Sequence, residues 1–296
     1  MTQTMERPAA PADRPTPPAH SSFNTRRMLT IARTELKQLV QARDYWIPMV
    51  ALGAIFFLIV PGILMLTITR IGDVHIVHQI SKTLDILPQA AQSQIRGTSA
   101  QGRTAYALAV FLFAPVAVVV PLTISTAVGA ATLVGERERG TGEFLAHSPA
   151  TAKEIYIGKL AASLVPGYLT TIVGFGLYSL LVNGLAAGEV GGWFFPTTNW
   201  LILMFWVIPP FLAFTLSLVL RLSARVKSTA AAQQASGLVS LPLILVAYGQ
   251  STGALFGASV SGWTIGAIAW VIAIFSLMRG VRSVTRARLL GVANEV

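Results

Sequence analysis

Long apolar runs without a single charged side chain dominate this sequence. A transmembrane helix needs about 20 predominantly apolar residues, at roughly 1.5 Å per residue, to cross the hydrocarbon core of a bilayer. Only 11% of the chain is charged, whereas soluble domains carry roughly 25%, so a soluble globular fold is excluded. The sequence predicts an all-α, polytopic membrane protein with six transmembrane helices, at residues 46–68, 105–134, 160–182, 199–220, 231–250 and 262–278.

The basic residues gather on one side of these predicted spans. Because the number of spans is even, both termini share a side, and 18 of the 22 Lys and Arg residues lie on it. Loops rich in Lys and Arg stay in the cytoplasm, so the sequence predicts a multi-pass protein of the cytoplasmic (inner) membrane with both termini in the cytoplasm. The net charge of +10 then reflects orientation and contact with membrane lipids, and no nucleic acid partner is expected.

The chain divides into four parts by composition. Residues 1–23 are rich in proline and predict a disordered cytoplasmic leader. Residues 24–45 predict an amphipathic helix, residues 46–280 form the six-span domain, and residues 281–296 form a basic cytoplasmic tail. Basic side chains at the end of the last span and in the tail are expected to meet anionic lipid headgroups. These are Arg279, Arg282, Arg286 and Arg288.

The segment before the first span places apolar side chains at three- and four-residue steps, with basic residues between them. This spacing predicts a helix with one apolar face, lying on the cytoplasmic surface of the membrane. A basic flank that only orients the first span would have a similar composition. The residues that we expect to characterise this helix are Arg33, Leu36, Lys37 and Val40.

Between the second and third spans lies the only charged cluster that separates two long spans. Glu and Arg alternate there, Gly140 interrupts the run, and Thr141 can cap a short helix that presents Phe144 and Leu145. Two exposed apolar residues among charges suit docking into the groove of a partner, but an ordinary membrane-surface loop has the same composition. The candidate docking residues are Glu136, Arg137, Glu138, Arg139, Gly140, Thr141, Glu143, Phe144 and Leu145.

Two features predict irregular backbone within the membrane. Five of the six spans contain proline, which removes a backbone donor and predicts a kink. The stretch AYGQSTGALFGASVSGW between the fifth and sixth spans is uncharged and rich in Gly and Ser. It predicts an apolar turn that re-enters the membrane and is buried against protein.

No residue pattern gives this chain an energy source of its own. The phosphate-binding pattern GxxxxGK[ST] is missing, since Gly158-Lys159 is followed by Leu160. None of the six spans holds an ionisable side chain of the kind that ion-coupled transporters use. We therefore expect no enzyme, no cofactor and no metal site in this chain. It has no cysteine, and the pair His75 and His78 would offer a metal only two imidazoles.

Hydroxyl side chains interrupt the apolar surface of two predicted spans. A mostly apolar lining with a few hydroxyls would suit a hydrophobic or amphipathic substrate. Such hydroxyls also bond to carbonyls of their own helix, and the sequence leaves both interpretations open. The candidate pathway residues are Thr123, Ser125, Thr126, Ser236 and Ser240.

The charged loop resembles the corresponding loop of ABC-2 type transporter permeases. The match runs Glu136-x-Glu138-x-Gly140-Thr141-x-Glu143-x-Leu145, then Pro149, Glu154-Ile155 and Gly158-Lys159. The layout is similar too, with an amphipathic lead-in, six spans and an apolar turn before the last one, so the resemblance covers about residues 24–280. Gly142 and His147 depart from it, where the family usually has a larger apolar residue and a small polar one.

The resemblance implies a type V exporter fold. Two such membrane domains, either two copies or one copy and a similar permease, would pair, and each would dock on an ATPase subunit that binds ATP and Mg²⁺. Residues Arg137 to His147 would form the coupling helix and residues 24–45 the connecting helix. The expected function is then the permease subunit of an exporter for a hydrophobic or amphipathic substrate. A secondary transporter, a channel or a membrane anchor without ATP coupling is the alternative.

Overall fold

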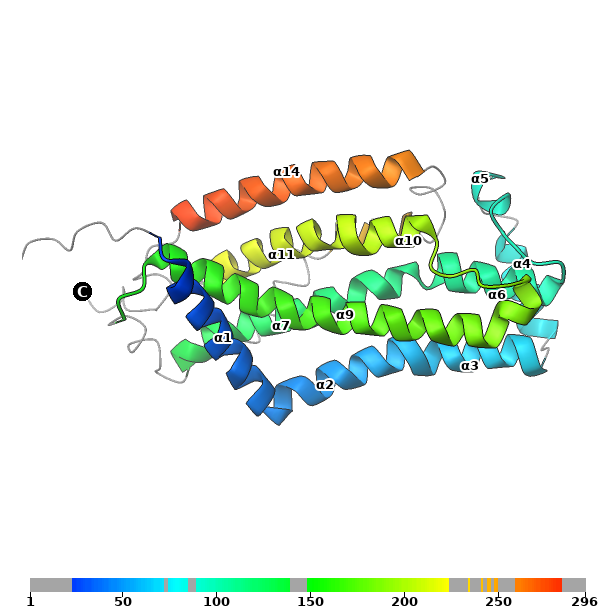
Figure 1. Ribbon diagram of the computed structural model, residues 1–296, viewed down its shortest axis with the longest axis horizontal. Coiled ribbons are helices and arrows are strands. Elements are labelled where there is room, and N and C mark those ends of the chain that lie inside the picture. Colours follow the sequence, from blue (N-terminus) through cyan, green and yellow to red (C-terminus); the bar gives the residue numbers. More distant parts are fainter. Residues whose placement is uncertain are drawn as a thin grey trace, which may run out of the picture.

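The computed structural model describes residues 23–71, 74–84, 89–138, 148–223 and 259–283, with a few single positions between 234 and 249. Every regular element within these residues is a helix (Figure 1), which confirms the all-helical class for this part of the chain. The first half holds α1 (Thr25–Gln41), α2 (Arg43–Ala54), η1 (Ile55–Ile59), α3 (Val60–Leu66), η2 (Thr67–Ile71), α4 (Val74–Leu84), α5 (Gln89–Gln92), α6 (Ala100–Ala107), η3 (Leu108–Leu112) and α7 (Ala114–Glu138). The second half holds α9 (Ala152–Val190), α10 (Thr198–Ile202), η4 (Leu203–Val207), α11 (Ile208–Ser223) and α14 (Ser259–Ser283).

Long apolar helical stretches run side by side and form a bundle (Figure 1). Five of them are long and apolar enough to cross a membrane within the described residues, and they correspond to the predicted spans one to four and six. The predicted span at 231–250 and the predicted re-entrant turn fall almost entirely outside the described residues. The five stretches are Arg43–Arg70, Ala100–Thr132, Ala152–Val190, Thr198–Leu222 and Gly262–Arg282.

Helix α9 is much longer than the span predicted from its apolar run at 160–182. It has 39 residues and is therefore roughly 58 Å long at 1.5 Å per residue, about twice the thickness of the hydrocarbon core. It begins at a capping box formed by Thr151 and Glu154, and it ends at Gly191, whose φ of 97° is left-handed. The apolar run could not show this extension, because buried polar residues such as Glu154 and Asn183 find partners in the folded chain.

The predicted amphipathic helix at 24–45 is divided at Ala42. This residue has an extended conformation, with φ −90° and ψ 97°, and its N–H closes the end of α1 by bonding to the carbonyls of Gln38 and Leu39. Helix α2 then starts at Arg43 and continues directly into the first span. Figure 1 shows that α1 consequently meets α2 at a corner and crosses α9 near one end of the bundle.

Three of the π-helical turns end two or three residues before a proline. Val60, Phe113 and Ile208 each donate their N–H to the carbonyl five residues earlier, and prolines follow at Pro61, Pro115 and Pro209. Proline cannot donate a backbone hydrogen bond and clashes with the carbonyl four residues before it, so the helix widens there. At these three positions the irregular backbone next to a proline is a single wide turn, whereas Pro48, Pro121 and Pro166 lie inside α-helices.

Aromatic residues of α9, α10 and the intervening loop form the core at the end of the bundle opposite α1. Tyr178, Phe195 and Trp200 pack in one cluster, with ring centroids 4.9 to 6.1 Å apart. Two carbonyls of the turn η3 accept hydrogen bonds from side chains of this cluster: the Tyr178 hydroxyl donates to Ala109 at 2.9 Å and the Trp200 indole donates to Val110 at 2.8 Å. Side-chain donors of this kind allow irregular backbone to be buried within a membrane domain.

Candidate functional site

The predicted docking loop connects the end of α7 to the start of α9. The backbone of Glu136, Arg137 and Glu138 belongs to the last turn of α7. The other candidate docking residues lie outside the described residues: Arg139, Gly140, Thr141, Glu143, Phe144 and Leu145. What the structure does describe is the set of contacts that holds both ends of this loop, and these contacts involve α1.

Glu154 closes the N-terminal ends of two helices at once. One carboxylate oxygen accepts the backbone N–H of Thr151 at 2.8 Å, within the capping box of α9. The other accepts the backbone N–H of Asn24 at 2.6 Å. Asn24 is in turn the N-cap of α1, and its side chain accepts from the N–H groups of Arg26 and Arg27. Because Glu154 is completely buried, these N–H donors are needed to stabilise its carboxylate in the charged form. The same carboxylate thus accepts hydrogen bonds at the N-terminal ends of both α1 and α9.

We expect Glu154→Gln to lower the free energy of unfolding by about 2 kcal/mol, because hydrogen bonds to a charged group contribute roughly 1.5–3 kcal/mol. An amide keeps one acceptor oxygen but presents an NH₂ donor to the second backbone N–H. Thermal unfolding of the purified protein in detergent measures the loss. Glu189→Gln, near the far end of the same helix, is the control, since Glu189 accepts only a 3.3 Å bond from Ser99 in the described contacts. Equal losses in the two variants would contradict a special role of Glu154.

Arg27 adds a second connection between α1 and the segment that precedes α9. Its guanidinium donates to the carbonyl of Pro149 at 3.0 Å. Residues 148–151 are the first described residues after the predicted docking loop. The first turn of α1 is therefore fixed directly to the chain that leaves this loop.

Gly158 allows α1 to lie directly on α9. A Cβ atom added at this position would come within 3.0 Å of the carbonyl oxygen of Met28 and of the Ile31 side chain. Contacts this short are rarely compatible with an unshifted backbone, so a side chain at position 158 would push the two helices apart. Ala32, the next residue on this face of α1, is buried as well.

Lys159 joins three helices through a single ammonium group. It donates to the Glu35 carboxylate of α1 at 2.7 Å and to the Thr132 carbonyl of α7 at 2.8 Å. Lys159 is fully buried and the Glu35 side chain is only 14% exposed. A buried ammonium must be paired and hydrogen-bonded to persist. The pair thus fixes α1 to both of the helices that flank the predicted docking loop.

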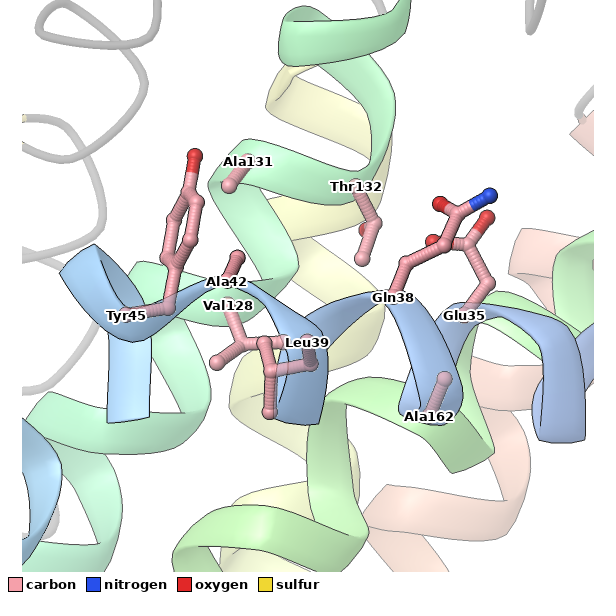
Figure 2. Close-up of a pocket in the computed structure, with 9 residues that line it drawn as sticks. All are labelled: Glu35, Gln38, Leu39, Ala42, Tyr45, Val128, Ala131, Thr132 and Ala162. Carbon is pink, nitrogen blue, oxygen red and sulfur yellow. The ribbon is translucent and has the colours of Figure 1, made fainter. Parts of the chain in front are cut away.

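A small crevice lies beside this ion pair. Figure 2 shows Glu35 and Gln38 of α1 side by side near Thr132 of α7, with Tyr45 at the other end of the crevice. Its volume is about 60 Å³, which accommodates a few water molecules and is far below the roughly 300 Å³ of the smallest usual ligand sites. The crevice is therefore a feature of the helix junction rather than a substrate site.

Tyr156 extends the junction to two further spans. Its hydroxyl bonds to the Ser217 hydroxyl of α11 at 2.9 Å, and the Ser276 hydroxyl of α14 lies 3.1 Å from the same oxygen of Ser217. Gly280 of α14 passes so close that a Cβ there would collide with the Tyr156 hydroxyl. The first two turns of α9 therefore contact α1, α7, α11 and α14. We call this region, centred on Glu154, Tyr156, Gly158 and Lys159, the α9 hub.

Of the residues expected to characterise the amphipathic helix, Arg33, Lys37 and Val40 are exposed and Leu36 is half-buried. The packing of α1 instead uses Asn24, Ala32 and Glu35. Glu35 follows Ile31 by four residues and precedes Leu39 by four, so it is an acidic residue within the apolar stripe. An acidic residue at such a position indicates a buried partner of opposite charge, and the sequence-based prediction did not include Glu35.

The candidate pathway hydroxyls have two different environments. Thr123 and Thr126 donate to carbonyls four residues earlier in α7, at 2.8 and 2.7 Å. Ser125 is buried beside Gly167, and its hydroxyl has no hydrogen-bond partner within the described part of the chain. Ser236 and Ser240 lie outside the described residues. Of the two interpretations that the sequence left open, Thr123 and Thr126 thus follow the one in which the hydroxyl bonds to a carbonyl of its own helix.

His75 and His78 are both exposed on α4. In the described ranges, no group of three or more His, Cys, Asp or Glu side chains is arranged to hold a metal ion.

A comparison of the sequence with models of protein families shows which family the chain resembles. The model of a family described as ABC-2 family transporter protein matches residues 29–261, which includes most of α1, the predicted docking loop and the α9 hub. No curated protein shows significant sequence similarity to the chain.

Proposed function

Since the chain belongs to the ABC-2 family of transporter proteins, we propose that it is the permease subunit of an ATP-binding cassette exporter, driven by a separate ATPase subunit. That partner would bind ATP and Mg²⁺. The permease would pair with a second copy or with a similar permease. The loop at residues 136–145 would dock on the ATPase, and both termini would lie in the cytoplasm.

The attachment of α1 to both ends of the docking loop carries this proposal. Nucleotide-driven movement of an ATPase can act on the spans only through elements that move together with the loop. The Lys159 contacts with Glu35 and Thr132, at 2.7 and 2.8 Å, connect α1, α7 and α9. The Tyr156 bond to Ser217 connects them to α11. A displacement of the loop would therefore shift α1, the end of α7, the start of α9 and the end of α11 together.

An apolar groove between the first span and α9 supports a hydrophobic or amphipathic substrate. It has a volume of about 370 Å³, within the range of small-molecule sites. No charged side chain lines it, and its only hydroxyl is that of Thr170. Val50, Phe57 and Leu58 border it on one side, and Leu169, Val173 and Leu177 border it on the other.

The experiment that tests the proposal is purification of the tagged protein from its native membrane, followed by an ATPase assay of what accompanies it. We expect an ATP-binding subunit to co-purify. Phe144→Ala/Leu145→Ala should release this subunit or reduce substrate-stimulated hydrolysis by at least about tenfold, since truncating a central apolar anchor of an interface costs 1–2 kcal/mol or more.

Val271→Ala/Ile272→Ala is the matched control, because it removes a similar apolar pair from the exposed face of α14. It should leave co-purification unchanged. A preparation that transports substrate without any ATPase would instead favour a secondary transporter or a channel. A preparation that neither transports nor hydrolyses, but retains a soluble enzyme, would favour a membrane anchor.

A further inference from the structure

A groove separates the start of α9 from the last turns of α14. Figure 1 shows that these two helix ends lie at the same end of the bundle, which is also the end that α1 crosses. The groove has a volume of about 310 Å³, and its surface is almost entirely apolar. Ile157 and Leu160 line it from α9, and Leu277, Met278 and Val281 line it from α14.

Two cations border this groove, one on each helix. Lys153 stands on the first turn of α9 and Arg282 stands near the end of α14, and both are exposed. Neither Asp nor Glu is among the residues that line the groove. The nearest acidic neighbour in sequence, Glu154, accepts hydrogen bonds from Asn24 and Thr151. Within the described residues, the apolar trough thus ends in a positive rim that no acidic side chain of its lining offsets.

We propose that this groove binds one anionic phospholipid of the cytoplasmic leaflet. An acyl chain would lie along Leu160, Leu277 and Val281, and the phosphate would lie between Lys153 and Arg282. Guanidinium and ammonium groups are the usual protein partners of phosphate. Basic pockets between transmembrane helices on the cytoplasmic side recognise anionic headgroups in this way. The assignment depends on this end of the bundle being cytoplasmic, but it does not depend on an ATPase partner.

The positive rim favours a lipid over a second copy of the chain. A symmetric dimer that packs through this groove would bring the same surface of two chains together. The cations of one copy would then approach those of the other, and like-charge juxtaposition costs several kcal/mol. An anionic lipid meets both the apolar floor and the rim without that penalty.

Occupancy of the groove would act on the α9 hub. Tyr156 lines the groove, and the same residue bonds to Ser217 of α11. A bound lipid would fill the space between α9 and α14 beside this bond and hold the two helices at a fixed separation. A lipid in the groove would therefore add a further contact between α9 and α14 at the α9 hub.

The test is native mass spectrometry of the full chain in lipid nanodiscs that contain equal amounts of phosphatidylglycerol and phosphatidylcholine. The wild type should retain one phosphatidylglycerol. Lys153→Gln/Arg282→Gln should bind it roughly 30-fold more weakly, because a basic residue near anionic lipid contributes about 1 kcal/mol and 1.4 kcal/mol corresponds to tenfold. Lys82→Gln/Arg96→Gln, which neutralises two exposed cations elsewhere, should retain the lipid like the wild type.

Leu277→Trp keeps both cations but fills the trough, and it should also lose the bound lipid. A general attraction of basic residues to anionic membranes would survive this substitution, so retention would overturn the site. Equal retention of both lipids by the wild type, or unchanged retention in Lys153→Gln/Arg282→Gln, would overturn it as well. Lys153→Arg/Arg282→Lys keeps both positive charges and should bind phosphatidylglycerol like the wild type. This result would show that the loss in Lys153→Gln/Arg282→Gln comes from the missing charges and not from misfolding. None of these readouts needs an ATPase, so failure of the proposed transport function would leave them unaffected.

Discussion

Lys159→Met should destabilise the folded protein by roughly 3 kcal/mol, the lower end of the cost of breaking a buried ion pair. The methionine leaves the Glu35 carboxylate without its ammonium partner at a site where Glu35 is only 14% exposed. It also removes the donor to the Thr132 carbonyl, 2.8 Å from Lys159 Nζ. The expected result is early melting of the contact between α1 and α9, measured by thermal unfolding in detergent and by proteolysis of α1.

Two variants make this prediction specific. Lys37→Met removes the same type of side chain from an exposed position on α1 and should change the stability by no more than about 0.5 kcal/mol. Glu35→Met/Lys159→Met should regain most of the loss, because an apolar pair can replace a buried ion pair at little cost. If Lys159→Met were as mild as Lys37→Met, the ion pair would not hold α1 in place.

Gly167→Ala should separate α7 from α9, although alanine is normally the better helix former. A Cβ at this position would collide with the Ser125 hydroxyl and would stand 2.6 Å from the carbonyl oxygen of Pro121. Overpacking of this kind costs typically 1–3 kcal/mol. Since the Pro121 carbonyl is backbone, the clash cannot be relieved by a change of rotamer.

Gly176→Ala is the matched control on the same helix. Apart from adjoining residues and the backbone of its own helix, no atom of the described residues lies within 4 Å of a Cβ added there. The substitution should therefore stabilise the protein by roughly 0.5–1 kcal/mol through its helix propensity. The two glycine variants are thus expected to shift the melting temperature in opposite directions. Shifts of the same sign would contradict the close approach of α7 and α9 at Gly167.

Apolar runs located the spans but not their ends. The run at 160–182 lies within α9, yet α9 extends beyond it in both directions to Ala152 and Val190. The extension at its start carries Glu154 and Lys159, which a hydropathy argument places outside the membrane helix. Both are buried because donors and acceptors from α1 and α7 satisfy them. Asn24, Glu35 and Thr132 are distant in sequence, so no local pattern could reveal them. The capping-box pattern Thr151-x-x-Glu154 is local and could have located the start of α9.

The residues that join the helices were partly visible in the sequence. The resemblance included Gly158-Lys159 and Glu154, but only as members of a motif, and gave them no role. Their roles follow from geometry, in the close approach at Gly158 and the pairing of Lys159 with a residue 124 positions away. For α1, the periodicity predicted a helix but did not predict the break at Ala42, where the backbone is extended.

The most direct test of the central claim uses the absence of cysteine in this chain. Phe144→Cys, labelled with a photoreactive benzophenone in native membranes, should cross-link to a protein that carries the GxxxxGK[ST] motif of an ATPase. Val271→Cys, on the exposed face of α14, should cross-link to lipid and not to that protein. If the label at position 144 gave only the lipid products found at position 271, the loop would not dock on an ATPase, and the proposed exporter would be contradicted.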